Sequence, residues 1–233
     1  MIARARRWLP QAPSTARRAN SSRVAATSLP RRPWGASSRN ARLPREFRRY
    51  LQAVALHGLG DFAVTLLILR AIQILTPSHG AVRAGAIGMG LYAFHNVIGA
   101  AAAFPAGVLG DRIGHRAILA AGYLLAAATF VGFIFAPARV AALAALFGLA
   151  GIYVAIQDTL EKSTATELLP REVRATGYGV LASVNGIGDF VSSMAVGFLW
   201  SAVSPAAGFI YAASLTGLGG AALIFTWPET SGA

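Results

Sequence analysis

Two ionisable side chains lie four residues apart inside the first long apolar stretch of the chain, His57 and Asp61. A helix would place both on one face, because residues four apart in a helix are neighbours. A histidine beside a buried carboxylate can take up and release a proton near neutral pH. Proton coupling is therefore one interpretation of the pair, and a polar contact that packs two helices is the other.

Three further polar residues interrupt apolar sequence. Ionisable groups in lipid are expensive and are functional candidates by default. Arg70 follows Asp61 by nine residues, near the outer end of the same stretch, where its side chain could extend to the interface. His95 and Asn96 are adjacent in the next stretch. We expect these residues to line a cavity or to take part in coupling.

A similar four-residue spacing recurs late in the chain, where Asn185 and Asp189 lie beside Gly186 and Gly188. The glycines could loosen a helix and turn its carbonyl groups toward a cavity. Tight crossing of two helices is the alternative interpretation. Asn185 and Asp189 therefore join the candidates for a cavity or coupling site.

Gln157 and Asp158 complete the polar set, and Glu161 follows them closely. Both acids lie toward the end of an apolar stretch. We expect Asp158 and Glu161 to lie near the cytoplasmic exit and to pair with Lys162 or Arg174.

A short charged turn joins two long apolar stretches at residues 107–116, GVLGDRIGHR. Gly107 and Gly114 would let the backbone reverse with two helices packed closely. Asp111 could accept hydrogen bonds from the free N–H groups of the following helix. Arg112 and Arg116 could pair with acids on neighbouring helix ends and hold one face of the protein closed. The turn is either such a gate or a device that only sets topology and caps helices.

These residues need long apolar elements to position them, and the composition supplies such elements. The chain is 55% hydrophobic and 13% charged, with a mean hydropathy of +0.54, and soluble domains carry about 25% charged residues. A bilayer span needs about 20 apolar residues. We predict an all-α membrane protein with six transmembrane helices, at approximately residues 50–75, 84–110, 117–136, 139–160, 174–200 and 205–227.

Positive charge is distributed unevenly along the chain. Residues 1–50 hold 13 arginines and one acid, whereas residues 51–233 have no net charge. Because basic residues favour the cytoplasmic side, we predict that both termini are cytoplasmic. The charged turn and the basic residues 162–174 would lie on that side, and Arg83 and Arg139 would lie on the other side of the membrane.

We expect three regions: a basic disordered tail (1–45), a six-helix transmembrane domain (46–229) and a short C-terminal tail (230–233). The basic tail, rich in Arg, Ser, Ala and Pro, has no apolar periodicity and no secretory signal. Three interpretations stay open: a segment held by anionic lipids, an organellar transit peptide, or an extension upstream of a truncated coding region. Nothing in the tail is typical of a folded nucleic-acid reader, so we expect no nucleic-acid partner.

The charged turn resembles the signature G-x-L-a-D-r-x-G-r-k-x-x-l of the major facilitator superfamily. Seven positions match: Gly107, Leu109, Asp111, Arg112, Gly114, Arg116 and Leu119. Residues 45–70 are similar to the start of the family's seventh helix, and residues 161–179 to its loop between helices ten and eleven. The six stretches therefore resemble helices 7–12 of a twelve-helix transporter.

This resemblance implies a secondary carrier that moves a small molecule by alternating access, with substrate bound between two six-helix halves. A chain of this length would need a homodimer or a separate N-terminal half. Efflux of a drug or small metabolite, driven by protons, across a bacterial inner membrane is the implied class. The alternative is a non-transporting truncated or scaffold membrane protein.

Several other classes of protein are excluded or disfavoured by the residues. The chain has no cysteine, which excludes disulfides and thiolate chemistry. The last histidine, His115, falls in a loop, so a serine protease of the membrane is disfavoured. No phosphate-binding loop and no metal-ligand spacing occurs. We expect no enzyme, no cofactor and no metal.

Overall fold

The computed structural model describes residues 43–225, which all lie in one compact unit of the chain. Every regular element in this range is helical. The predicted C-terminal tail and nearly all of the predicted basic tail lie outside the described residues. The helices are α1 (Arg45–Gly58), α2 (Thr65–His79), α3 (Ala81–Ile113), α4 (His115–Ile134), α5 (Val140–Leu168), the short 3₁₀ helix η1 (Arg171–Val173), α6 (Arg174–Ala202) and α7 (Pro205–Phe225).

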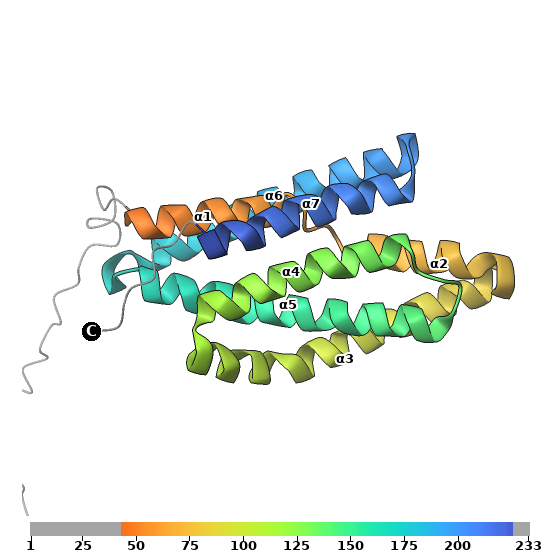
Figure 1. Ribbon diagram of the computed structural model, residues 1–233, viewed down its shortest axis with the longest axis horizontal. Coiled ribbons are helices and arrows are strands. Elements are labelled where there is room, and N and C mark those ends of the chain that lie inside the picture. The colour runs from red at the N-terminus through yellow and green to blue at the C-terminus, as the bar shows by residue number, and fades with distance from the viewer. Residues whose placement is uncertain (1–42, 226–233) are drawn as a thin grey trace, which may run out of the picture. The chain divides into compact units, whose positions relative to one another are not determined.

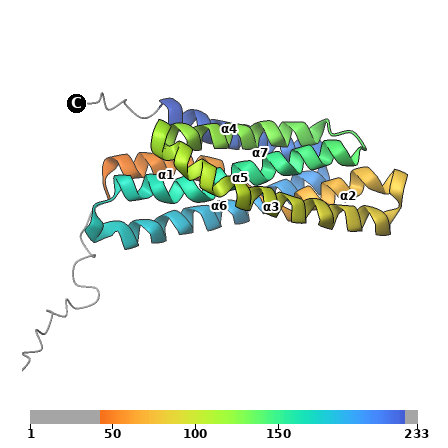
Figure 2. The same ribbon diagram turned by 90° about the horizontal axis from the view of Figure 1, so that it is seen from below.

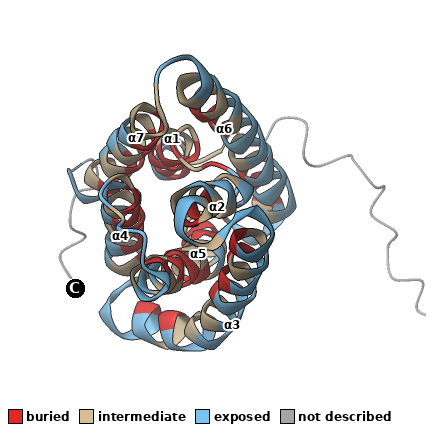
Figure 3. Cartoon of the chain, turned by 90° about the vertical axis from the view of Figure 1, so that its right-hand side faces the viewer, coloured by how far each residue is buried: buried red, intermediate tan, exposed pale blue. Residues whose placement is uncertain are grey.

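The long helices lie side by side and form an elongated bundle (Figure 1 and Figure 2). The most extensive contacts join α3 to α5 and α4 to both α5 and α7, and α6 packs mainly on α1 and α7. An end-on view shows buried residues on the helix faces that meet inside the bundle, and broad exposed faces on α3 and α6 (Figure 3). The helical fold class predicted from composition is confirmed.

Five helices, α3 to α7, are long and apolar enough to cross a bilayer. The sixth predicted span is not a single helix, because the first apolar stretch is interrupted between Gly58 and Thr65. Its two parts, α1 and α2, have 14 and 15 residues, and each is shorter than a bilayer span requires. They lie toward opposite ends of the bundle and together run along its length (Figure 1).

All five predicted breaks between helices are present, and three of them are shorter than expected. The breaks at residues 137–139 and 201–205 agree with the ends of α4 and α6. The turn expected at 76–80 narrows to Gly80, with a φ of +76°, and the turn at 111–116 narrows to Gly114, with a φ of +109°. At the break expected over 161–174, α5 instead continues to Leu168. Single glycines in the left-handed region allow these shorter turns.

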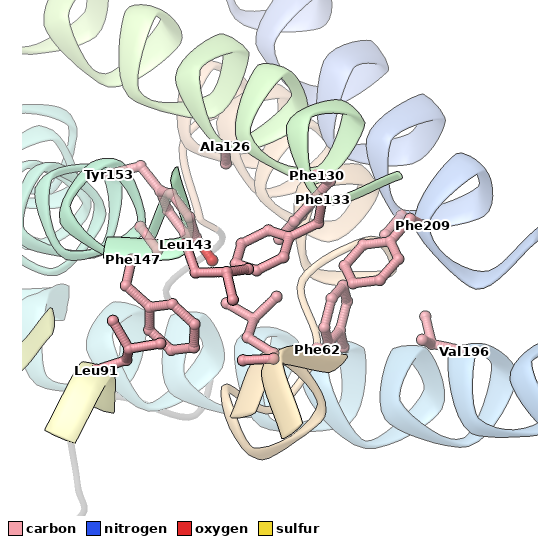
Figure 4. Close-up of a cluster of buried hydrophobic side chains, with 14 of the residues drawn as sticks. Phe62, Leu91, Ala126, Phe130, Phe133, Leu143, Phe147, Tyr153, Val196 and Phe209 are labelled. Atoms are coloured by element: carbon pink, nitrogen blue, oxygen red, sulfur yellow. The ribbon is translucent and has the colours of Figure 1, made fainter. Parts of the chain in front are cut away.

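The interior contains two clusters of buried apolar side chains, one toward each end of the bundle. The first cluster is rich in stacked and edge-on aromatic rings, and Phe62 contacts both Phe130 and Phe209 there (Figure 4). The second cluster includes Phe47, Tyr50, Leu119, Tyr123 and Leu160. Tyrosines of the second cluster also contact the polar residues described next.

Candidate functional site

Asp61 lies in the interruption between α1 and α2, where it faces α5. Its Oδ2 accepts a hydrogen bond from Nε2 of Gln157, at 3.0 Å. The same oxygen lies 3.8 Å from Nε2 of His57. His57 is buried and stacks on Tyr123, with ring centroids 3.6 Å apart and planes 4° from parallel. The structure therefore brings the predicted pair together, although Asp61 is outside a regular helix.

The interruption is held in place by close packing and by a backbone hydrogen bond. A Cβ on Gly60 would lie 2.6 Å from the carbonyl oxygen of Ala212 and 2.6 Å from Oγ1 of Thr216, so only glycine fits against α7. The N–H of Ala63 donates to Oγ of Ser193 on α6, at 3.1 Å. This bond satisfies a backbone group that the broken helix leaves free.

Glu161 on α5 is a second buried carboxylate, only 3% exposed. Its Oε1 accepts a hydrogen bond from the hydroxyl of Tyr123 on α4, and its Oε2 accepts one from Nδ2 of Asn185 on α6, each at 2.5 Å. Its backbone carbonyl accepts the hydroxyl of Tyr50 on α1, at 2.9 Å. Four helices therefore meet at this residue.

The prediction that Glu161 pairs with Lys162 or Arg174 near the exit is wrong. Helix α5 continues for almost two turns beyond Glu161, and this keeps the carboxylate inside the bundle. Arg174 instead donates from Nε to the carbonyl oxygen of Leu169, at 3.1 Å. Sequence reasoning missed Glu161 and Tyr123 as members of the site, because Glu161 was assigned to a loop.

We call the set His57, Asp61, Tyr123, Gln157, Glu161 and Asn185 the polar cluster. His57, Tyr123 and Glu161 are buried, and the other three are half-buried. Within residues 43–225, neither carboxylate of the cluster lies within ion-pair distance of a lysine or arginine. Both are held by neutral donors, which satisfy hydrogen bonds without cancelling the charge. A carboxylate in apolar surroundings is stabilised by taking up a proton. The arrangement can therefore hold and release protons, and protonation would change which hydrogen bonds it makes.

His95 and Asn96 lie apart from the polar cluster, in a groove between α3 and α5. The groove has a volume of about 260 Å³ and is also lined by Asp158. The carbonyl of Phe147 is 3.3 Å from Nδ1 of His95, and Asn96 donates to the carbonyl of Tyr92 at 2.8 Å. The expectation that Asp158 pairs with Lys162 or Arg174 is also wrong, since among the described residues it makes no ion pair.

Two other candidates do not join the polar cluster. Arg70 is half-buried on α2, and its Nε is buried without a hydrogen-bond partner in the described part of the chain. Asp189 is exposed on α6, one turn beyond Asn185. Of that predicted pair, Asn185 bonds to the buried carboxylate of Glu161.

In the charged turn, α3 extends through Asp111 and Arg112 before the chain reverses at Gly114. Nε2 of His115 lies 2.9 Å from Oδ1 of Asp111, and its Nδ1 lies 2.7 Å from Oε1 of Glu167 at the end of α5. Only the imidazolium form has two N–H donors to give to two carboxylates. Asp111 therefore accepts from a side chain of the next helix, whereas free backbone N–H groups were expected.

The remaining residues of the turn differ in their surroundings. Arg116 donates from Nε and Nη2 to the carbonyl oxygens of Leu223 and Ile224, which end α7, as cations near helix C-termini commonly do. Gly107 faces α5, where an added Cβ would lie 3.5 Å from Thr159. Arg112 is exposed. The turn thus ties together the ends of α3, α4, α5 and α7.

Comparison with known proteins agrees with this arrangement. The family model of the Major Facilitator Superfamily matches residues 47–232. An uncharacterized transporter of this type from Methanocaldococcus jannaschii is 30% identical over 183 residues, which are 78% of this chain and 45% of that protein. The chain therefore spans about half the length of the curated relative that it matches. The match over nearly all described residues, with the signature turn, shows that the chain belongs to the major facilitator superfamily.

Proposed function

We propose that the chain is the C-terminal half of a secondary carrier that exports a small molecule in exchange for protons. The observation that carries this proposal is the polar cluster, in which two carboxylates lie among apolar helices and are held by neutral donors. Buried ionisable groups in membrane helices commonly mark ion pathways and proton relays.

Proton exchange at the cluster would be coupled to helix movement through hydrogen bonds. Ionised Glu161 accepts from both Tyr123 and Asn185. Protonated Glu161 carries a hydroxyl donor in place of one acceptor position, so one of these bonds must be lost or reversed. Because α6 packs mainly on α1 and α7, loss of the Asn185 bond would free α6 from α5. Such a step would favour one access state of the carrier.

The carrier needs a second six-helix unit, supplied by another copy of the chain or by a separate N-terminal half. The exposed faces of α3 and α6 support this proposal. On α6 the exposed side chains include Ile187, Phe190, Met194 and Phe198, and Phe198 is 70% exposed. Their spacing places them on one stripe of the helix. A stripe of this kind is typical of a surface that packs against another apolar surface.

A multi-pass protein of a bacterial inner membrane is the proposed location, and the distribution of charge supports an orientation with both termini cytoplasmic. One end of the bundle holds the charged turn, the start of α1 and the segment between α5 and α6, and these carry most of the basic residues. The other end holds Arg83 and Arg139. Basic residues favour the cytoplasmic side.

Transport by purified protein in liposomes tests the proposal. The liposomes contain a pH-sensitive dye, and a panel of cationic, anionic and neutral metabolites and drugs is added one compound at a time. We expect at least one compound to drive saturable proton movement, and Asp61→Asn or His57→Gln to abolish proton movement. Glu172→Gln, an exposed acid in η1, is the matched control. Unaltered coupling in both cluster variants would remove His57 and Asp61 from the mechanism.

The alternative is a scaffold that binds other membrane proteins through the exposed faces of α3 and α6 without transporting a solute. Cross-linking in membranes addresses the partner directly, because the chain contains no native cysteine. A carrier formed by two copies predicts disulfide-linked dimers of Phe190→Cys, and none of Val131→Cys on α4. Dimers or complexes without transport of any compound in the panel would favour the scaffold.

A further inference from the structure

The groove between α3 and α5 presents a carboxylate that nothing in the described protein neutralises. Asp158 is exposed in the groove. Among residues 43–225 it makes no hydrogen bond or ion pair through its side chain. Asp158 differs from the two carboxylates of the polar cluster, Asp61 and Glu161, because its oxygens are free to bind a ligand.

The neighbouring polar groups of the groove also offer acceptors, since their donors are occupied. Nδ1 of His95 donates to the carbonyl of Phe147, so Nε2 of the neutral ring is an acceptor. Nδ2 of Asn96 donates to the carbonyl of Tyr92, and its amide oxygen remains available. A ligand that satisfies these groups together with Asp158 must carry a positive charge and several N–H donors.

The rest of the lining is small and apolar. Gly99 and Gly151 bring α3 and α5 close together, because a Cβ on Gly151 would lie 2.5 Å from the carbonyl oxygen of His95. Ala100 and Ala103 extend the apolar surface beside the polar groups. The volume of about 260 Å³ suits a small organic molecule and falls slightly below the usual range for drug-sized ligands.

We infer that the α3–α5 groove binds a small organic ammonium ion, with Asp158 as its counter-charge and its apolar part against Ala100 and Ala103. This inference rests on the proposed function and names the class of solute that the carrier recognises. Primary and secondary ammonium groups fit, because they carry the N–H donors that the acceptors require. A quaternary ammonium group has none.

An ammonium group could come from a soluble amine or from the headgroup of phosphatidylethanolamine. Asp158 lies ten residues before the end of α5 at Leu168, which is about 15 Å along the helix. This distance separates Asp158 from the end of the helix, where a lipid headgroup would lie. We therefore assign the groove to a soluble amine, and the lipid composition of the assay distinguishes the two sources.

Binding of radiolabelled 2-phenylethylammonium to the full chain in phosphatidylcholine nanodiscs tests the inference. The neutral isostere 2-phenylethanol and empty nanodiscs are the ligand controls. We expect saturable binding that Asp158→Asn weakens about tenfold to a hundredfold, because a charge-assisted hydrogen bond is lost. Glu172→Gln removes the same charge outside the groove and should leave binding unchanged.

A second pair of variants tests the groove without altering charge. Ala100→Leu fills the groove, whereas Ala93→Leu adds the same side chain to an exposed position of α3 outside it. We expect only Ala100→Leu to weaken binding. Thermal unfolding of each variant in detergent shows whether it remains folded.

Three results would overturn the inference: no saturable binding by the folded protein, equal affinity for 2-phenylethanol, or an affinity of Asp158→Asn within about twofold of the original. Displacement of the probe by phosphatidylethanolamine would overturn the assignment of the groove to a soluble amine. Transport of an anionic or neutral solute without ammonium binding would overturn this inference alone. Ammonium binding without transport of any compound would support a binding site in the groove and overturn the proposal that the protein is a carrier.

Discussion

Glu161 has surroundings that set it apart from an acid on a helix surface. Its two carboxylate oxygens accept from Tyr123 and Asn185, and its backbone carbonyl accepts from Tyr50. Side chains from α4 and α6 therefore depend on one carboxyl group. Removal of both acceptors would leave the buried donor of Tyr123 and the half-buried donor of Asn185 without partners, and an unsatisfied buried donor costs about 1–3 kcal/mol.

Glu161→Gln and Glu161→Leu separate the proton-binding role of this residue from its packing role. Glutamine keeps an acceptor and the length of the side chain, so we expect a folded protein whose transport no longer moves protons. Leucine leaves Tyr123 and Asn185 without acceptors, and we expect it to lower stability by about 2–4 kcal/mol. Thermal unfolding in detergent and proton movement in liposomes measure the two effects. Normal proton movement by Glu161→Gln would exclude this carboxyl group from coupling.

Gly114 is required by the backbone of the charged turn, because its φ of +109° lies in a region that side chains rarely adopt. We expect Gly114→Ala to lower the stability of the bundle by about 1–2 kcal/mol. Gly179→Ala on α6 is the control, since a Cβ there meets nothing within 4 Å. Alanine favours a helix over glycine, so the control should be neutral or stabilising. Equal loss in both variants, measured by thermal unfolding, would contradict the role given to Gly114.

The proximity of one pair of polar residues could be predicted from spacing alone. His57 and Asp61 lie within 3.8 Å of each other, as their four-residue spacing predicts. Contacts between distant segments could not be predicted in this way. Glu161 lies 38 residues from Tyr123 and 24 from Asn185, and only the packing of α4, α5 and α6 brings them together.

At the scale of elements, composition predicted six long helices, of which five are present and the first is interrupted. Residues 50–75 are long and apolar enough for one span, and Gly58, Gly60 and Asp61 within them were taken as part of it, although such residues favour a break. The break depends on the fit of Gly60 against α7 and on the bond between Asp61 and Gln157. Both are tertiary contacts, and neither is visible in local sequence. The length of α5 was underestimated because charged residues near its end were read as a loop.

The crossing of α3 and α5 positions the groove. A Cβ on Gly151 would meet backbone atoms of His95 at 2.5 Å and Gly99 at 3.0 Å, and backbone cannot rotate away. We expect Gly151→Ala to separate the helices and to destabilise the protein by about 1–3 kcal/mol. Gly90→Ala on α3, where a Cβ meets nothing within 4 Å, should have no such effect. Thermal unfolding compares the two, and an unaffected Gly151→Ala would show that the helices are not in close contact.

For the whole molecule, the orientation in the membrane can be tested with single cysteines. Ala138→Cys lies between α4 and α5, and Glu172→Cys lies between α5 and α6, at the other end of the bundle. Because positive charge is concentrated near the second position, we expect an impermeant maleimide to label only Ala138→Cys in intact cells. Glu172→Cys should be labelled after the cells are permeabilised. The reverse pattern would invert the proposed topology.

The account depends on a bundle that lies in lipid while its polar groove stays open to water. Asn96 is exposed in the α3–α5 groove, and Val131 is 43% exposed on α4. A charged thiosulfonate reagent reacts with thiolates in water and not with thiols in hydrocarbon. With the reagent on both sides of the membrane, we predict rapid modification of Asn96→Cys and none of Val131→Cys. Equal modification at both positions would contradict a lipid-embedded carrier.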